Sequence, residues 1–142
     1  MAEEKSPVLA LFYCQNIPES GDAERRVLEK HYGGSVRFFP VPCSGRVEPL
    51  HFLRALEEYA DAAYLVTCPE GACRYFEGNR RASKRVERTQ SIIAGIGLEQ
   101  ERIGIVVTSK EDRKGLAALT EEIRERIQTL PLSPVFRKAA NR

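Results

Sequence analysis

No apolar run in this 142-residue chain approaches the length of about 18 residues that a membrane-spanning helix requires. The first residues, MAEEKSPVLALFYC, also lack the basic flank and the small-residue cleavage site of a signal peptide. We therefore expect a soluble, cytoplasmic protein. In that reducing compartment, closely spaced cysteines are more often metal ligands or redox groups than disulfides.

The charge shows no marked excess of either sign, with 22 basic and 20 acidic residues. This balance excludes the general electrostatic footprint of a nucleic-acid-binding protein, so any basic patch must be local. Internal repeats and low-complexity tracts are absent as well. A chain of this length can bury a core without a stabilising cross-link, which predicts one domain over residues 1–142 with a short ragged tail from about residue 131.

Four short apolar runs alternate with helical periodicity, which is the pattern of βα units around a parallel sheet. We expect an α/β, flavodoxin-like domain with about four parallel strands in the order 2-1-3-4 and helices on both faces. Ser109 and Asp112 have the spacing of a capping box that would open the last helix. The expected strands are 8–14, 36–43, 62–68 and 104–109, and the expected helices are 22–33, 49–61, about 80–98 and 111–130.

The only four cysteines fall at one end of this arrangement. Cys14, Cys43 and Cys68 each occupy the last position of a different expected strand, and Cys73 lies five positions beyond Cys68. Neighbouring parallel strands lie about 4.8 Å apart, and ligands bind in the crevice outside their carboxyl ends. We therefore expect all four thiols to converge on one rim of the sheet.

Several roles are open to these cysteines. Each would be a small core hydrophobe if taken alone, but four of them at one edge would be an unusual scatter. A catalytic thiol needs a basic partner, and His31 and His51, the only histidines, are expected on helix surfaces without a nucleophile motif. Metal binding remains, as zinc or as an iron–sulfur cluster. The C-x4-C spacing is longer than that of most zinc knuckles and is found in plant-type clusters.

The sequences around these cysteines carry a more specific pattern. VPCSGRVEP at residues 41–49, CPEGACRYFEGN at 68–79 and a basic helix that ends in GLEQER resemble the hydrogenase iron-sulfur subunit family, the delta subunit of methyl-viologen-reducing hydrogenases. The resemblance implies a [2Fe-2S] cluster with Cys14, Cys43, Cys68 and Cys73 as candidate ligands. It also implies an electron relay, not catalytic on its own, between a hydrogenase or other dehydrogenase and a heterodisulfide-reductase-like flavoprotein.

The chain departs from this family at the end of its first strand. Family members carry adjacent cysteines and a C-x-x-C there, whereas this sequence reads FYCQNI, with Tyr13 and Ile17 where further thiols are expected. The four remaining cysteines complete a cluster only if every one of them is a ligand. The alternative is a clusterless or zinc-holding adaptor that docks partners in the same type of complex. A flavin or nucleotide binder is disfavoured because no Gly-rich loop follows the first strand.

Basic residues gather near the cysteines. Two interpretations are open, an ordinary solvated helix face and a docking surface for an acidic partner, and an anionic small ligand is a further option. Cations at a helix start oppose the helix dipole, so clustering them there runs against local preference. The candidate partner-binding residues are Arg46, Arg80, Arg81, Lys84 and Arg85.

Overall fold

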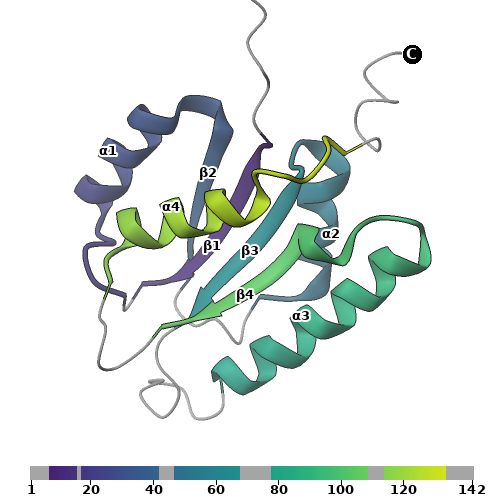
Figure 1. Cartoon of the computed structure of the whole chain (residues 1–142). Helices are drawn as coiled ribbons and strands as arrows, with labels where there is room; N and C mark the ends of the chain where they lie inside the picture. The colour runs from purple at the N-terminus through teal and green to yellow at the C-terminus, as the bar shows by residue number, and fades with distance from the viewer. Residues whose placement is uncertain (1–6, 16, 42–46, 68–77, 109–113, 134–142) are drawn as a thin grey trace, which may run out of the picture.

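The computed structural model describes residues 7–15, 17–41, 47–67, 78–108 and 114–133, and these ranges form one four-stranded sheet (Figure 1). Every pairing is parallel and the spatial order is β2-β1-β3-β4, which confirms the α/β fold and the expected 2-1-3-4 order. The strands are β1 Leu9–Cys14, β2 Val36–Val41, β3 Ala62–Thr67 and β4 Ile103–Val107.

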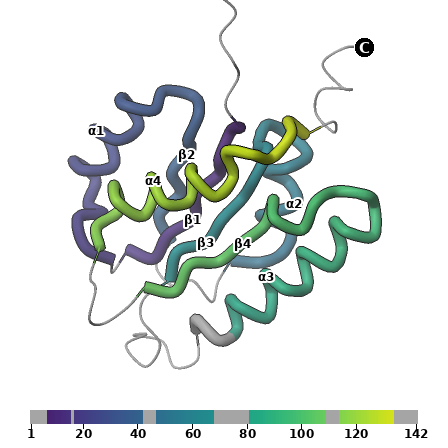
Figure 2. Tube along the Cα trace, in the orientation of Figure 1, coloured from purple at the N-terminus to yellow at the C-terminus, as the bar shows by residue number. Residues whose placement is uncertain are grey.

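Helices cover both faces of the sheet (Figure 2). One face lies under α1 and α4, and the other under α2 and α3. In the described part of the chain, no helix is long and apolar enough to cross a membrane. The helices are α1 Asp22–Tyr32, α2 Pro49–Glu58, α3 Gly78–Gly95 and α4 Leu116–Ile127, with short 3-10 turns η1 Gly33–Ser35 before β2 and η3 Gln100–Arg102 before β4.

The sequences of the two central strands explain their position. LALFYC in β1 and AAYLVT in β3 are nearly continuous apolar runs, and every residue in both strands is buried. Such runs suit strands with helices on both faces, because neither face meets water. The edge strands β2 and β4 are only partly buried. The sheet therefore divides the core into two apolar layers, one on each face.

The last helix begins later than expected. Its first residue is Leu116 and its N-cap is Gly115, so the prediction that a Ser109–Asp112 capping box opens it is wrong; both of those residues lie outside the described ranges. The Leu116 N–H donates to the Pro18 carbonyl at 3.1 Å, which ties the start of α4 to the turn after β1. The start of α4 therefore involves a contact with a residue distant in sequence, which a local capping pattern cannot predict.

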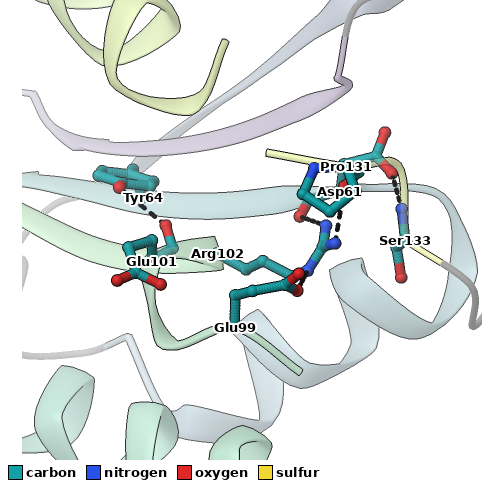
Figure 3. Close-up of polar contacts among 7 residues, drawn as sticks. All are labelled: Asp61, Tyr64, Glu99, Glu101, Arg102, Pro131 and Ser133. Carbon is teal, nitrogen blue, oxygen red and sulfur yellow. Dashed lines mark hydrogen bonds and ion pairs between the residues drawn. The ribbon is translucent and has the colours of Figure 1, made fainter. Parts of the chain in front are cut away.

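A buried arginine closes the amino edge of the sheet (Figure 3). Arg102 is 1% exposed and donates from Nη1 to the Asp61 carbonyl at 3.0 Å and from Nη2 to the Pro131 carbonyl at 2.7 Å. Its Nε bonds to Glu99 Oε1 at 2.7 Å. A backbone hydrogen bond and the bond from Arg102 lower the pKa of Glu99. The guanidinium thus has a partner for each of its nitrogens, as a buried charge requires.

The Asp61 side chain connects the two ends of the described chain, and Figure 3 shows its bond to Ser133. Its carboxylate accepts hydrogen bonds from the Val8 N–H at 2.8 Å and the Ser133 N–H at 2.6 Å, and both Asp61 and Ser133 are buried. The first residues of the expected ragged tail, 131–133, are therefore held against the amino edge. Residues 134–142 lie outside the described ranges.

Gly104 in β4 lies directly beside the ring of Tyr64, its register partner in β3. A Cβ atom at Gly104 would lie 2.3 Å from Tyr64 Cε2, and the Tyr64 hydroxyl is fixed by donation to the Glu101 carbonyl at 2.9 Å. We expect Gly104→Ala to lower the free energy of unfolding by about 2 to 3 kcal/mol, measured by urea denaturation. Gly34→Ala is the control, since nothing lies within 4 Å of a Cβ there. Equal losses in the two variants would contradict this prediction.

Candidate functional site

The candidate site lies at the carboxyl edge of the sheet, where Cys14 is the last residue of β1. Cys14 is 1% exposed and belongs to the apolar layer on the α1 and α4 face. After it the chain turns back, because the Ile17 N–H donates to the Cys14 carbonyl at 3.2 Å. The expected strand end at Cys14 is confirmed, and its thiol occupies a dry position at the end of a central strand.

The two strands that flank β1 end close to the level of Cys14. β2 ends at Val41, the register partner of Cys14, and the Gln15 N–H extends this ladder to the Val41 carbonyl at 3.0 Å. On the other side Tyr13 is paired with Val66, and β3 ends one residue later. Three chain segments therefore reach the same short stretch of the carboxyl edge.

The other three candidate ligands, Cys43, Cys68 and Cys73, lie outside the described residues, as does Arg46. β2 is described up to Val41 and β3 up to Thr67, so the expected strand ends at Cys43 and Cys68 lie just outside the described ranges. Among the side chains that the structure describes, no three His, Cys, Asp or Glu residues come together to hold a metal ion. The convergence of four thiols stays a prediction.

Two threonines fix the point at which the chain leaves β3. The Thr67 carbonyl accepts hydrogen bonds from both the backbone N–H of Thr108, at 3.2 Å, and its hydroxyl, at 2.9 Å. Both residues are buried. This clasp joins the ends of β3 and β4 immediately before the segment that contains Cys68 and Cys73. Sequence reasoning missed it, although a threonine near the end of each of two adjacent strands is a signal that could be sought.

A second clasp connects α3 to the start of α2. Arg85 of α3 donates from Nη1 to the Val47 carbonyl at 3.3 Å and pairs through Nε with Glu48 Oε1 at 3.5 Å. Glu48 is the N-cap of α2, and its N–H donates to His51 Nδ1 at 2.8 Å. The eighth residue of α3 is thus tied to the start of α2. His51 lies on the helix surface as expected, and it also caps the helix.

Tyr13 and Ile17, which replace the expected additional cysteines, are core residues. Tyr13 is fully buried, packs edge-on against Phe38 with ring centroids 6.4 Å apart, and has its pKa raised to about 12, mainly by desolvation. Ile17 is 5% exposed and belongs to the same apolar layer as Cys14. Bulk at these positions fills space that thiols would otherwise occupy, so Cys14 is the one sulfur that β1 brings to the edge.

The basic residues at the start of α3 divide into two groups. Arg85 is half-buried and engaged with α2, whereas Arg81 and Lys84 are exposed. The side chain of Arg80 lies outside the described part of the chain. Of the three candidate partner-binding cations whose side chains the structure describes, Arg81 and Lys84 are therefore exposed and Arg85 is not.

The sequence is similar to those of hydrogenase subunits. The family described as methyl-viologen-reducing hydrogenase, delta subunit, matches residues 9–131. The iron-sulfur subunit of the F420-non-reducing hydrogenase vhu of Methanopyrus kandleri is 33% identical, covering 92% of this chain and 97% of the relative. The iron-sulfur subunit of the F420-non-reducing hydrogenase vhc of Methanococcus voltae is 34% identical over 72% of each chain.

A longer relative contains a similar segment. One of the subunits of the ferredoxin:CoB-CoM heterodisulfide reductase of Methanosarcina mazei is 28% identical over 76% of this chain, but the match covers only 14% of that protein. Together with the match over residues 9–131, which includes every described strand and helix, these similarities show that the chain belongs to the methyl-viologen-reducing hydrogenase delta subunit family.

Proposed function

We propose that this protein is an electron-transfer subunit that binds a [2Fe-2S] cluster through Cys14, Cys43, Cys68 and Cys73. It works in the cytoplasm, inside a complex, between a hydrogenase or other dehydrogenase and a heterodisulfide-reductase-like flavoprotein. Support comes from the family and from relatives that are named hydrogenase iron-sulfur subunits and heterodisulfide reductase subunits. The observation that carries the proposal is the burial of Cys14 at the edge where the two other cysteine-bearing segments leave the sheet.

The donor set fits such a cluster in number and chemistry. Four cysteine thiolates are the usual ligands of a [2Fe-2S] centre. Cys68 is bonded directly to Thr67, and Cys43 follows Val41 by two residues, so the covalent chain keeps both near the edge that Cys14 occupies. The bound cluster would accept and release one electron at a time.

The described residues contribute position and a dry environment. Burial of Cys14 excludes water from one side of the site, which influences the potential of any centre held there. The Thr67–Thr108 clasp fixes the residue that precedes Cys68, and the Arg85 clasp fixes Val47, four residues after Cys43. The fold would therefore fix Cys14 and the backbone next to Cys68, and so restrict where the cluster ligands can lie.

Metal analysis tests this function directly. We expect anaerobically purified protein to contain about two iron atoms and two acid-labile sulfides per chain, with the visible absorption and reduced-state EPR signal of a [2Fe-2S] centre. Stoichiometric zinc without iron would instead support the adaptor alternative in its zinc-holding form. Absence of both metals from protein purified anaerobically from its own cells would support a clusterless adaptor. That alternative is favoured by Tyr13 and Ile17, which are buried core residues at the positions where further cysteines were expected.

A further inference from the structure

The outward face of α3 carries an unusual row of side chains. Arg81, Lys84, Arg88 and Ile92 follow one another at intervals of three or four residues, and Ile96 continues the row just beyond the helix end. All five are exposed, with Ile92 42% and Ile96 69% exposed. Residues three or four apart lie on one helix face. We name these five residues the α3 stripe; its first half is basic and its second half is apolar.

Neither half of the α3 stripe serves the fold. Ala82, Val86 and Ile93, on the opposite side of the helix, already supply its buried contacts with the sheet. Arg81 lies at the end of the first turn, where a cation opposes the helix dipole, and that turn has no acidic residue to offset it. The exposed isoleucines leave apolar area in water. Both features cost stability, which points to a role outside this domain.

We propose that the α3 stripe is a docking surface for an acidic protein partner, with acidic side chains facing Arg81, Lys84 and Arg88 and an apolar patch covering Ile92 and Ile96. The proposal rests on the proposed function in that the partner belongs to the same electron-transfer complex. Arg85 is not part of the surface, because it is occupied with Val47 and Glu48.

The position of the α3 stripe determines how a bound partner would be oriented relative to the sheet. α3 begins near the carboxyl ends of β3 and β4 and runs away from them (Figure 1). From Arg81 to Ile92 the helix rises about 16 Å, at about 1.5 Å per residue. A partner whose acidic part meets the basic half therefore lies beside the edge that holds Cys14, and its apolar part lies toward the opposite edge.

The surrounding charges favour a protein partner over nucleic acid or an anionic membrane. Glu87 lies exposed on α3 beside the stripe, and Glu101 lies exposed on the following turn. Polyanionic surfaces would repel both carboxylates, whereas a folded protein can place its own acidic groups opposite the three cations alone. The net charge of only +2 also provides little general attraction to polyanions.

The electrostatic half is tested by charge reversal with a matched control. The complex is purified anaerobically from its own cells through a tag on this chain, and the retained proteins are identified and quantified. We expect Lys84→Glu with Arg88→Glu to reduce the retained partner about tenfold at 0.1 M salt, where the Debye length is about 10 Å. Arg26→Glu with Lys30→Glu on α1 makes the same charge change at exposed positions with the same spacing, and should reduce it less than about twofold.

The apolar half has an equally close control. Ile96→Ser removes an isoleucine that is 69% exposed, and Val27→Ser removes a valine on α1 that is 67% exposed. We expect only Ile96→Ser to weaken retention of the partner, and its effect should persist at 1 M salt, where a Debye length of about 3 Å removes most of the charge attraction. Equal effects of the α3 and α1 variants, or no effect of either, would overturn the docking proposal.

The outcomes separate this inference from the proposed function. Retention of an acidic protein unrelated to hydrogenases or heterodisulfide reductases, lost in the α3 variants alone, would support the docking surface and contradict the proposed function. A wild-type chain that purifies alone would overturn the docking surface, whatever its iron content. Sedimentation that shows a dimer dissociated by the α3 variants would replace the foreign partner with a second copy, and binding of vesicles or nucleic acid would replace it with an anionic surface.

Discussion

Cys14→Ala is expected to lose at least about nine tenths of the iron and acid-labile sulfide of the wild-type protein, because three thiolates cannot complete a four-cysteine cluster. The fold should survive. The change removes one sulfur from a buried position, which costs about 1 kcal/mol, and a domain of this size buries enough apolar area without metal. Iron, sulfide and the EPR signal are measured beside the far-ultraviolet circular dichroism of the same preparation.

Val41→Ala is the matched control for Cys14→Ala. It trims the residue paired with Cys14 in the neighbouring strand and leaves every thiol in place. Its iron content should equal that of the wild type. If Cys14→Ala keeps all of its iron, Cys14 is a core thiol and not a ligand. If the variant unfolds instead, the metal site is structural and the relay proposal loses its basis.

Arg102→Ala is expected to have the largest effect on stability, lowering the free energy of unfolding by about 3 to 5 kcal/mol. The Asp61 and Pro131 carbonyls would lose their donors inside the protein, and the vacated volume would leave a cavity. Urea denaturation measures the loss. Arg54→Ala, at an exposed position on α2, is the control and should change stability by less than about 0.5 kcal/mol.

A small effect of Arg102→Ala, comparable to that of Arg54→Ala, would mean that the amino-edge network does not hold the sheet together. The iron content of folded Arg102→Ala should equal that of the wild type, because Arg102 lies at the edge opposite Cys14. Loss of iron from the folded variant would show that the two edges are coupled.

Much of the fold could be predicted because its determinants are local. The apolar runs of β1 and β3 indicate strands covered on both faces, and the alternation with helical segments leaves few topologies open. The end of β1 at Cys14 followed from the same run. The features of the fold that were not predicted depend on contacts between residues distant in sequence. α4 begins after Gly115, where the Leu116 N–H donates to the Pro18 carbonyl, a contact between residues almost 100 positions apart.

In the candidate site, too, local features could be predicted and contacts between distant residues could not. Clustering of basic residues at the start of α3 was visible in the sequence, but separating Arg85 from Arg81 and Lys84 required the contact with Val47, 38 positions away. Arginine is an ordinary surface residue, so the burial of Arg102 could not be anticipated from its type. The places of Cys43 and Cys68 relative to Cys14 remain predicted from strand order alone.

The single carboxylate of Asp61 binds the N–H groups of both Val8 and Ser133, so the two ends of the described chain lie at almost the same point of the amino edge. A module whose entry and exit coincide can be inserted into a loop of another polypeptide, or joined at either end, without spreading the host structure. The heterodisulfide reductase protein of Methanosarcina mazei, in which a similar segment makes up 14% of a longer chain, is the arrangement that such geometry permits. The position of the two described ends is therefore compatible both with a separate polypeptide and with a segment inside a longer one.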